Sequence, residues 1–301
     1  MHIPVLSEEV IKFLQPTNNK IYVDATIGCG GHTKKIFSVA PKCKIIGIDC
    51  DNFAIKYSKQ NLQQFLIQKN LVIFKDNFVN IKEILKKINI ERIDGIVFDF
   101  GLSSLQLKTS RGFSFNDDNL DMRMDTTLPL TGYYVINNFS KEELARIFFE
   151  YGEEKNSRFI AKKIVEYRKI KKITSAKELA EIVCSVSRQQ KFKKLFVKDL
   201  QQQITYRFHP ATKVFQAIRV FVNNELNNIF YGVTNAIDVL APNGRIVTIC
   251  YHSLEDRIVK NIFKSRNDIK ILTKKPIVPQ PQEIMSNKSS RSAKLRAAEK
   301  L

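Results

Sequence analysis

Hydrophobic and polar positions along the first hundred residues follow two alternating periods. Short continuous apolar runs, typical of buried strands, alternate with stretches in which apolar residues recur at helical spacing. Strands are predicted at 21–23, 44–48, 71–74 and 95–98, and helices at 5–15, 32–39, 53–68 and 80–89. Because apolar strands separated by helices indicate parallel β-α units, helices should cover both faces of the sheet.

This alternation stops near residue 109 and resumes near residue 209. The residues between contain helical stretches near 140–152, 155–170 and 175–187, but no convincing strand. The later pattern predicts a helical stretch at 211–240, a turn at 242–244, a strand at 245–250, a helix near 255–265 and a strand at 269–272. The predicted fold class is α/β, a Rossmann-like doubly wound sheet of residues 1–108 and 209–301, with a mainly helical domain inserted at 109–208.

Composition excludes several classes of protein. The chain has 301 residues, of which 44% are hydrophobic, so it can bury a sizeable core and is not a disordered chain. It lacks an apolar run long enough to span a bilayer and an N-terminal export signal, so a cytoplasmic protein is expected. The five cysteines form no CxxC pair, which favours reduced thiols and gives no metal site.

The net charge of +19 has two interpretations. A strong positive balance favours a polyanionic partner, above all nucleic acid. The abundance of Lys over Arg is also what an AT-biased genome would produce without any partner. Basic runs at 162–172, 188–198 and 288–300 are where the charge could matter, and the tail after Lys274 is expected to be loosely held.

A glycine-rich turn joins the first predicted strand to the following helix. It runs from Asp24 to His32, and Asp49 ends the next strand, 19 residues after Gly30. Glycines let the backbone approach a ligand closely, and a carboxylate at Asp49 can accept both hydroxyls of a ribose. The spacing fits NAD and S-adenosylmethionine (SAM), but an acid at the strand end disfavours a pyrophosphate. Alternatively, Asp24 and Asp49 only cap helices.

Further polar side chains are expected at the same edge of the sheet. Asp99 ends the fourth strand, and Asn77-Phe78 follows the third strand, where it could contact an adenine.

At this point the sequence resembles the MraW family of ribosomal RNA small-subunit methyltransferases. The matching motifs extend almost from end to end: His2-x-Pro4-Val5-Leu6, Asp24-x-Thr26-x-Gly28-x-Gly30-Gly31-His32, Gly47-Ile48-Asp49-x-Asp51, Asp99-x-Gly101-x-Ser103-Ser104-x-Gln106-Leu107, Arg111-Gly112-Phe113-Ser114-Phe115, Leu120-Asp121-Met122-Arg123-Met124-Asp125, Tyr151-Gly152-Glu153-Glu154, His209-Pro210-Ala211-Thr212, Phe215-Gln216-Ala217, His252-Ser253-Leu254-Glu255-Asp256-Arg257 and Arg291-Ser292-Ala293-Lys294-Leu295-Arg296.

The resemblance implies a class I SAM-dependent methyltransferase domain with an inserted helical domain for RNA recognition. It implies methyl transfer from SAM to N4 of a cytosine in the decoding region of 16S ribosomal RNA, in the cytoplasm. The implied partner is 16S rRNA or the small ribosomal subunit. The SAM contacts it implies are Gly30, Gly31, His32, Asp49, Phe78, Asp99 and Gln106.

The chemistry of methyl transfer suggests catalytic candidates. Cytosine N4 is a poor nucleophile, so acceptors that hold its hydrogens would help, and Asp99 and Ser103 in the 101–104 turn are the candidates. If Asp99 instead holds the ammonium group of SAM, Ser103 or backbone carbonyls must do this work. Methylation at C5 would need a cysteine nucleophile, but Cys250 is expected to be structural.

Candidate RNA contacts carry competing structural interpretations. Arg111, Phe113 and Phe115 could stack on an extruded base, or the two phenylalanines could belong to the core. His252 could be a base or a phosphate contact, or it could precede a helix with Ser253 as its N-cap. Lys213, where the family has Arg, and Arg291 in the basic tail complete the candidates.

Two rival functions remain from the sequence alone. One is a non-catalytic RNA-binding module that keeps a SAM-type fold, and the other is a Rossmann oxidoreductase. Exposed helices of the insertion could also mediate a homodimer.

Overall fold

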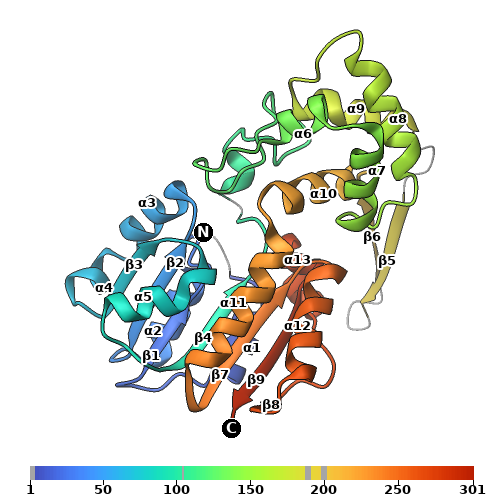
Figure 1. Ribbon diagram of the computed structural model, residues 1–301. Coiled ribbons are helices and arrows are strands. Elements are labelled where there is room, and N and C mark those ends of the chain that lie inside the picture. Colours follow the sequence, from blue (N-terminus) through green and yellow to red (C-terminus); the bar gives the residue numbers. More distant parts are fainter. Residues whose placement is uncertain (1–3, 104, 187–190, 198–201) are drawn as a thin grey trace. The chain divides into compact units, whose positions relative to one another are not determined.

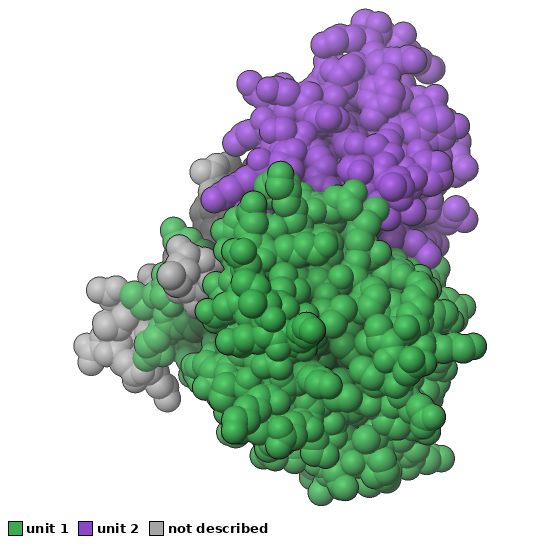
Figure 2. Space-filling model, turned by 90° about the vertical axis from the view of Figure 1, so that its left-hand side faces the viewer, with its two compact units in different colours: residues 1–104, 226–301 green, residues 105–225 purple. Residues whose placement is uncertain are grey.

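The computed structural model describes residues 4–103, 105–186, 191–197 and 202–301, and for 191–208 it describes only the course of the backbone. The chain forms two compact units, residues 1–104 with 226–301 and residues 105–225 (Figures 1 and 2). The sequence placed the boundaries at 108/109 and 208/209, so the structure assigns residues 209–225 to the inserted unit.

A seven-stranded sheet forms the centre of the first unit, in the order β3-β2-β1-β4-β7-β9-β8 (Figure 1). Its strands are β1 (Ile21–Asp24), β2 (Lys44–Asp49), β3 (Leu71–Lys75), β4 (Ile93–Asp99), β7 (Leu240–Cys250), β8 (Ile269–Ile271) and β9 (Lys294–Lys300). The first five of these pair in parallel, and β9 runs antiparallel to both of its neighbours. The strand order reverses between β1 and β4, so the doubly wound sheet that the sequence predicts is confirmed.

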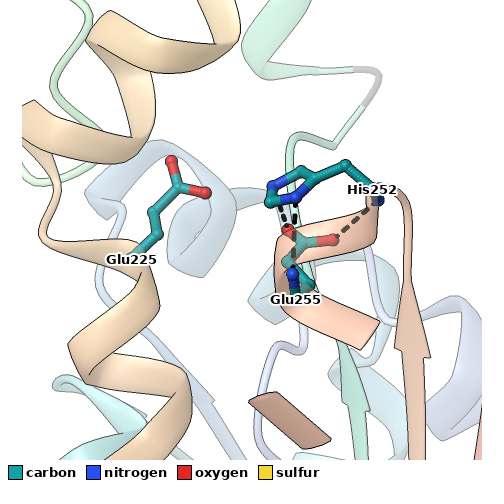
Figure 3. A group of neighbouring side chains, drawn as sticks. All are labelled: Glu225, His252 and Glu255. Atoms are coloured by element: carbon teal, nitrogen blue, oxygen red, sulfur yellow. Dashed lines mark hydrogen bonds and ion pairs between the residues drawn. The ribbon is translucent and has the colours of Figure 1, made fainter. Parts of the chain in front are cut away.

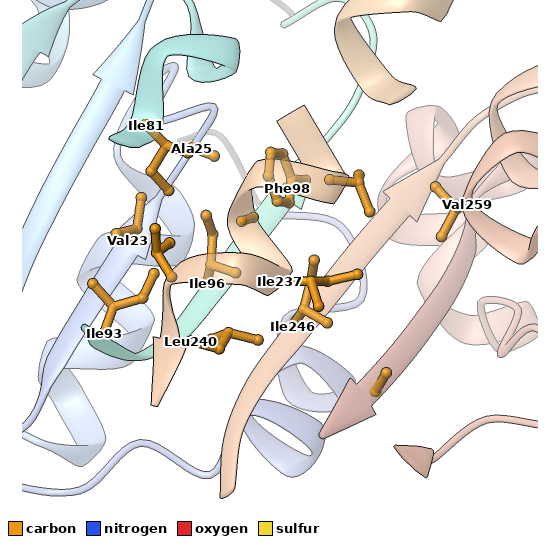
Figure 4. Packing of buried hydrophobic residues seen from close by; sticks show 14 of the residues in the cluster. Val23, Ala25, Ile81, Ile93, Ile96, Phe98, Ile237, Leu240, Ile246 and Val259 are labelled. Carbon is orange, nitrogen blue, oxygen red and sulfur yellow. The ribbon is translucent and has the colours of Figure 1, made fainter. Parts of the chain in front are cut away.

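Helices cover both faces of this sheet. They are α1 (Ser7–Leu14), α2 (Gly31–Val39), α3 (Asn52–Asn61), α4 (Gln63–Ile67), α5 (Ile81–Lys87), α11 (Glu225–Val239), α12 (Ser253–Ser265) and α13 (Pro281–Ser286). Helices α5, α11 and α12 contribute to one buried cluster, shown in Figure 4, and α1 and α2 contribute to a second. Successive strand residues point to opposite faces: Val23 and Phe98 belong to the first cluster, Tyr22 and Val97 to the second. This explains why the strands are apolar without interruption.

The inserted unit is mainly helical. It contains α6 (Gly132–Asn138), α7 (Lys141–Glu150), α8 (Ser157–Arg168), α9 (Ala176–Val186) and α10 (Thr212–Val222). Helix α7 begins at a capping box, in which the Ser140 hydroxyl accepts from the Glu143 N–H while the Glu143 carboxylate accepts from the Ser140 N–H. Its buried residues Leu144, Ile147 and Phe148 lie on one face of α7, which packs against α8 and α10.

The prediction that the insertion contains no strand is wrong. Strands β5 (Lys191–Val197) and β6 (Gln202–Phe208) form an antiparallel hairpin. The β-favouring residues of β5 are interspersed with lysines, so the segment was interpreted as a charge run. The rest of that basic run, 188–190 and 198, lies outside the described residues.

The prediction of a loosely held tail is also wrong. Strand β9 lies between β7 and β8, and Leu295, Ala297 and Ala298 are fully buried. Arg296 is buried as well and forms an ion pair with Asp256, its Nε lying 2.6 Å from Oδ1. A basic tail sequence concealed a strand because its charged head groups are neutralised by partners far away in the chain.

Smaller differences concern where elements end. The stretch predicted as one helix at 53–68 is divided at Leu62, and the stretch at 211–240 is divided at Asn223-Asn224, where Asn224 has a φ of 50°. Residues 242–244 interrupt the pairing of β7, as the predicted turn required, since Leu240 pairs with Ile93 and Arg245 with Gly95. Within the described parts of the chain, no helix has both the length and the apolar character needed to cross a membrane.

Replacing Leu295 by Ala should lower the free energy of unfolding by about 2–5 kcal/mol, because it leaves a cavity in the sheet core. Leu301, which is 65% exposed in the same tail, is the matched control, and Leu301→Ala should change stability by less than about 0.5 kcal/mol. Urea denaturation measures both. Equal, small effects would show that the tail does not belong to the core.

Candidate active site

Three aspartates end the three neighbouring strands β1, β2 and β4. Asp24 pairs in register with Gly47 of β2 and Val97 of β4, so Asp49 and Asp99 each lie two residues beyond its partner. Parallel strands are spaced by about 4.8 Å, so their carboxyl ends bring the three carboxylates to one edge of the sheet. This edge lies where the strand order reverses, the usual ligand position in doubly wound sheets.

The glycine-rich turn between β1 and α2 is tightly built. Gly28 and Gly30 have φ values of 49° and 79°, which favour glycine, and a Cβ on Gly30 would lie 2.6 Å from the Leu62 side chain. A Cβ on Gly31 would lie 3.1 Å from Pro4. A Cβ on Gly28, by contrast, would have no neighbour closer than 3.7 Å, so at Gly28 the turn presents bare backbone to open space.

Asp49 fixes this turn from the neighbouring strand. Its Oδ2 accepts a hydrogen bond from the Gly28 N–H at 3.0 Å, and its Oδ1 accepts from the Asp51 N–H at 2.9 Å. Burial raises the pKa of Asp49 to about 6, although these two hydrogen bonds act in the opposite direction. Asp49 therefore does not cap α3; Asp51 does, by accepting from the Phe53 N–H.

A buried network connects Asp24 with His32. The Thr33 hydroxyl donates to Asp24 Oδ2 at 2.7 Å, so Asp24 does not cap α2 through its backbone. Burial raises the pKa of Asp24; burial would lower the pKa of His32, but Asp99 and Asp24 outweigh it, so the His32 pKa is raised. Within the described residues, Asp24 Oδ1 and His32 Nδ1 have no hydrogen-bond partner although both atoms are buried.

Asp99 is held by residues from three directions. Its backbone N–H donates to the Thr26 hydroxyl at 2.7 Å. One carboxylate oxygen, Oδ2, lies 3.5 Å from His32 Nε2, and the other, Oδ1, accepts from the Tyr251 hydroxyl at 2.7 Å. Sequence reasoning named Tyr251 only as a departure from the family pattern and missed both Tyr251 and Thr26 as parts of the site.

Phe78 lies beyond β3 and is partly buried. Its ring packs edge-on against Phe98, with centroids 5.4 Å apart, and a Cβ on Gly232 of α11 would lie 2.4 Å from it. Asn77 caps the short turn that carries Phe78 by accepting from the Val79 N–H at 3.0 Å. Phe78 is thus fixed in place with part of its surface still accessible.

The candidate Ser103 follows Gly101, whose φ of 99° turns the chain away from β4. Ser103 is half-buried, and its neighbour Ser104 lies outside the described residues, as does His2 of the first motif.

The remaining candidates near the insertion belong to the second unit. Gln106 is buried there. The Arg111 guanidinium donates to the carbonyls of Arg123 and Met124 and lies 5.4 Å from the centre of the Phe113 ring, which is itself buried. These contacts favour the interpretation of Arg111 and Phe113 as parts of a folded loop.

Phe115 and Lys213 are more accessible than Phe113. Phe115 is half-buried, stacks on His209 with centroids 4.1 Å apart and meets Phe215 edge-on. The Lys213 ammonium donates to the Glu153 carbonyl. In the first unit, Arg291 is exposed in a short 3₁₀ turn, Lys288–Ser292.

His252 begins helix α12, as Figure 3 shows. Its Nδ1 accepts from the Glu255 N–H, and Glu255 Oε2 accepts from the His252 N–H at 3.2 Å, so the two form a capping box. The expectation that Ser253 is the N-cap is wrong by one residue. His252 Nε2 also lies 3.1 Å from Oε1 of the fully buried Glu255, so the structural interpretation of His252 accounts for both ring nitrogens.

The motifs match one protein family over the whole chain. The model of the MraW methylase family matches residues 1–301. The chain belongs to the MraW methylase family. This confirms the family resemblance of the sequence motifs and agrees with the strand order of the sheet, and the fold is that of a class I methyltransferase.

Relatives named "Ribosomal RNA small subunit methyltransferase H" extend over the same length. Those from Sulfurihydrogenibium azorense and Persephonella marina are 47% and 46% identical, and each alignment covers 100% of this chain and 99% of the relative. A solved rRNA methylase from Streptococcus thermophilus aligns with a TM-score of 0.45 at 11% identity, covering 98% of this chain and 93% of that one. Similarity at that level carries no weight for the site.

The raised pKa of Asp49 predicts a pH-dependent stability. Because folding disfavours the ionised carboxylate, the wild-type protein loses stability as the pH rises from about 4 through about 6. Asp49→Asn stays neutral, so the difference in unfolding free energy should shift in favour of the variant by roughly 2–3 kcal/mol between pH 4 and pH 7.

Urea denaturation of the ligand-free proteins at several pH values measures this shift. The difference at the lowest pH records the cost of altered hydrogen bonds alone and serves as the internal reference. A difference that is constant with pH would contradict the raised pKa.

Proposed function

We propose that this protein transfers a methyl group from SAM to N4 of a cytosine in the decoding region of 16S ribosomal RNA. The observation that carries the proposal is the Asp99 carboxylate, held at the end of β4 beside the glycine-rich turn in a chain of a methylase family. The relatives named as small-subunit rRNA methyltransferases support rRNA as the substrate.

The residues at the sheet edge fit SAM in chemical type. The exposed backbone at Gly28 allows close approach, and Asp49 beside it supplies a carboxylate for ribose hydroxyls. The buried Asp24 and His32 carry polar atoms without a described partner, next to Asp99, where an amino-acid end would need acceptors. Gly30, Gly31, Phe78 and Gln106 complete the proposed contacts.

Bound SAM supplies a methyl group on a positively charged sulfur. Asp99 would accept a hydrogen bond from the N4 amino group of cytosine, which favours pyramidal nitrogen and later removal of its proton. Ser103, two residues beyond the left-handed Gly101, is the second candidate acceptor. The enzyme then has mainly to align the nucleophile with the methyl group.

Methylation at cytosine C5 is disfavoured by the state of its required nucleophile. Cys250 is fully buried in β7, and burial raises the pKa of its thiol well above the usual value. A buried neutral thiol is a poor nucleophile.

RNA contacts are proposed for the inserted unit and the C-terminal segment. Lys162 and Lys163 of α8 are exposed, whereas Arg168 at the end of α8 donates to the Ile136 and Phe139 carbonyls and is structural. Phe115, Lys213 and Arg291 remain candidates for RNA contact, and Arg111, Phe113 and His252 have structural roles that can account for them. The homodimer and the cytoplasmic location stay predictions.

The protein should incorporate labelled methyl groups from SAM into 16S rRNA or small subunits, and nucleoside mass spectrometry should identify N4-methylcytidine. Cys250→Ser should keep at least about half of this activity, because no thiol takes part. SAM binding without transfer would favour the non-catalytic module, and binding of NAD in place of SAM would favour the oxidoreductase. C5-methylcytidine, lost in folded Cys250→Ser, would overturn the N4 assignment.

Reversing two charges on α8, Lys162→Glu with Lys163→Glu, should weaken binding to the small subunit at least several-fold and flatten its dependence on salt. SAM affinity should stay unchanged. The matched control is Lys86→Glu with Lys87→Glu, two exposed lysines on α5. Equal losses in the two double variants at moderate salt would mean that only the total charge matters.

A further inference from the structure

The hydroxyl of Tyr251 lies at the centre of the candidate site. Tyr251 follows β7 directly, and its hydroxyl donates to Asp99 Oδ1 at 2.7 Å. Its backbone N–H donates to Glu255 Oε2 at 2.6 Å, and a Cβ on Gly101 would lie 3.4 Å from its ring. The ring is therefore held at its backbone and along one side, so the position of the hydroxyl is well defined.

Tyr251 completes the fixation of Asp99. The Thr26 hydroxyl accepts from the Asp99 N–H and holds the backbone, but it leaves the carboxylate free to turn about its side-chain bonds. His32 Nε2 faces Oδ2 at 3.5 Å, a distance longer than a good hydrogen bond. The short bond from Tyr251 to Oδ1 is thus the strongest described restraint on the direction of the carboxylate lone pairs.

A restraint of this kind matters for methyl transfer. An acceptor must hold the amino hydrogens in line with the attack, and misplacement by about 1 Å can cost a hundredfold in rate. The tyrosine also remains a donor, because burial and the Asp99 carboxylate raise the pKa of Tyr251 well above its usual value.

We propose that Tyr251 is a positioning residue for methyl transfer, whose hydroxyl orients the Asp99 carboxylate toward the N4 amino group of the target cytosine. This inference rests on the proposed function and assigns Asp99 to the nucleotide rather than to the ammonium group of SAM. In the step itself, a bond forms between N4 and the methyl carbon as the carbon–sulfur bond breaks with its electron pair going to sulfur. N4 loses one proton, to Asp99 or through it to water.

Tyr251→Phe removes only the hydroxyl. We expect the single-turnover rate of methyl transfer at saturating SAM and RNA to fall about tenfold, because the carboxylate loses its strongest restraint. The dissociation constant for SAM, measured by calorimetry without RNA, should change by less than about twofold. The control is Tyr22→Phe, which removes another buried tyrosine hydroxyl, one that accepts from the Thr17 N–H at 2.9 Å, and should leave the rate unchanged.

A double-mutant cycle separates positioning from a general structural role. If the hydroxyl acts through Asp99, adding Tyr251→Phe to Asp99→Asn should lower the rate little beyond the loss in Asp99→Asn alone. Thermal melting of all variants shows whether they are folded to the same degree.

Three results would overturn the inference while the wild-type protein still forms N4-methylcytidine. They are an unchanged rate in Tyr251→Phe, rate losses that multiply in the double variant, and a weaker SAM affinity that accounts for the whole effect. The last result would assign Asp99 to the cofactor. Absence of N4-methylcytidine with the wild-type protein would instead contradict the proposed function.

Discussion

Parallel pairing of β1 with β2 and β4 is the constraint on which the candidate site depends. Because β1 lies between the other two strands, the carboxyl ends of all three meet at one edge, and Asp24, Asp49 and Asp99 meet with them. The glycine-rich turn must leave this edge tightly, which requires left-handed backbone at Gly28 and Gly30. The rest of the first unit keeps that edge rigid by covering both faces of the sheet with helices.

Bringing three carboxylates together in a partly buried place is costly, and the neighbouring groups show how the cost is offset. Asp49 accepts two backbone N–H groups, Asp24 accepts the Thr33 hydroxyl, and Asp99 accepts the Tyr251 hydroxyl. His32 lies between Asp24 and Asp99, and their charge raises its pKa against the effect of burial. The site is therefore one coupled network, in which a change at Tyr251 is felt first at Asp99.

The sequence was sufficient wherever the pattern is local. Apolar runs at Ile45–Ile48 and Ile96–Phe98, followed by an aspartate, predicted strands and their functional ends. It failed where a long-range partner decides the outcome. Strand β9 looked like a basic tail because Arg296 is neutralised by Asp256, forty residues away, and His252 was not expected to cap its own helix because its partner Glu255 had been assigned only to the first turn.

By itself, the sequence determined the doubly wound class, the family and the three aspartates at the strand ends, because strand periodicity and ordered motifs are written in consecutive residues. Only the tertiary structure decided that the C-terminal segment completes the sheet and that Tyr251 meets Asp99 from 152 positions away. The physical reason is that hydrogen bonds and buried ion pairs depend on distances between side chains from different elements. Those distances are set only when the strands pair and the helices pack against them.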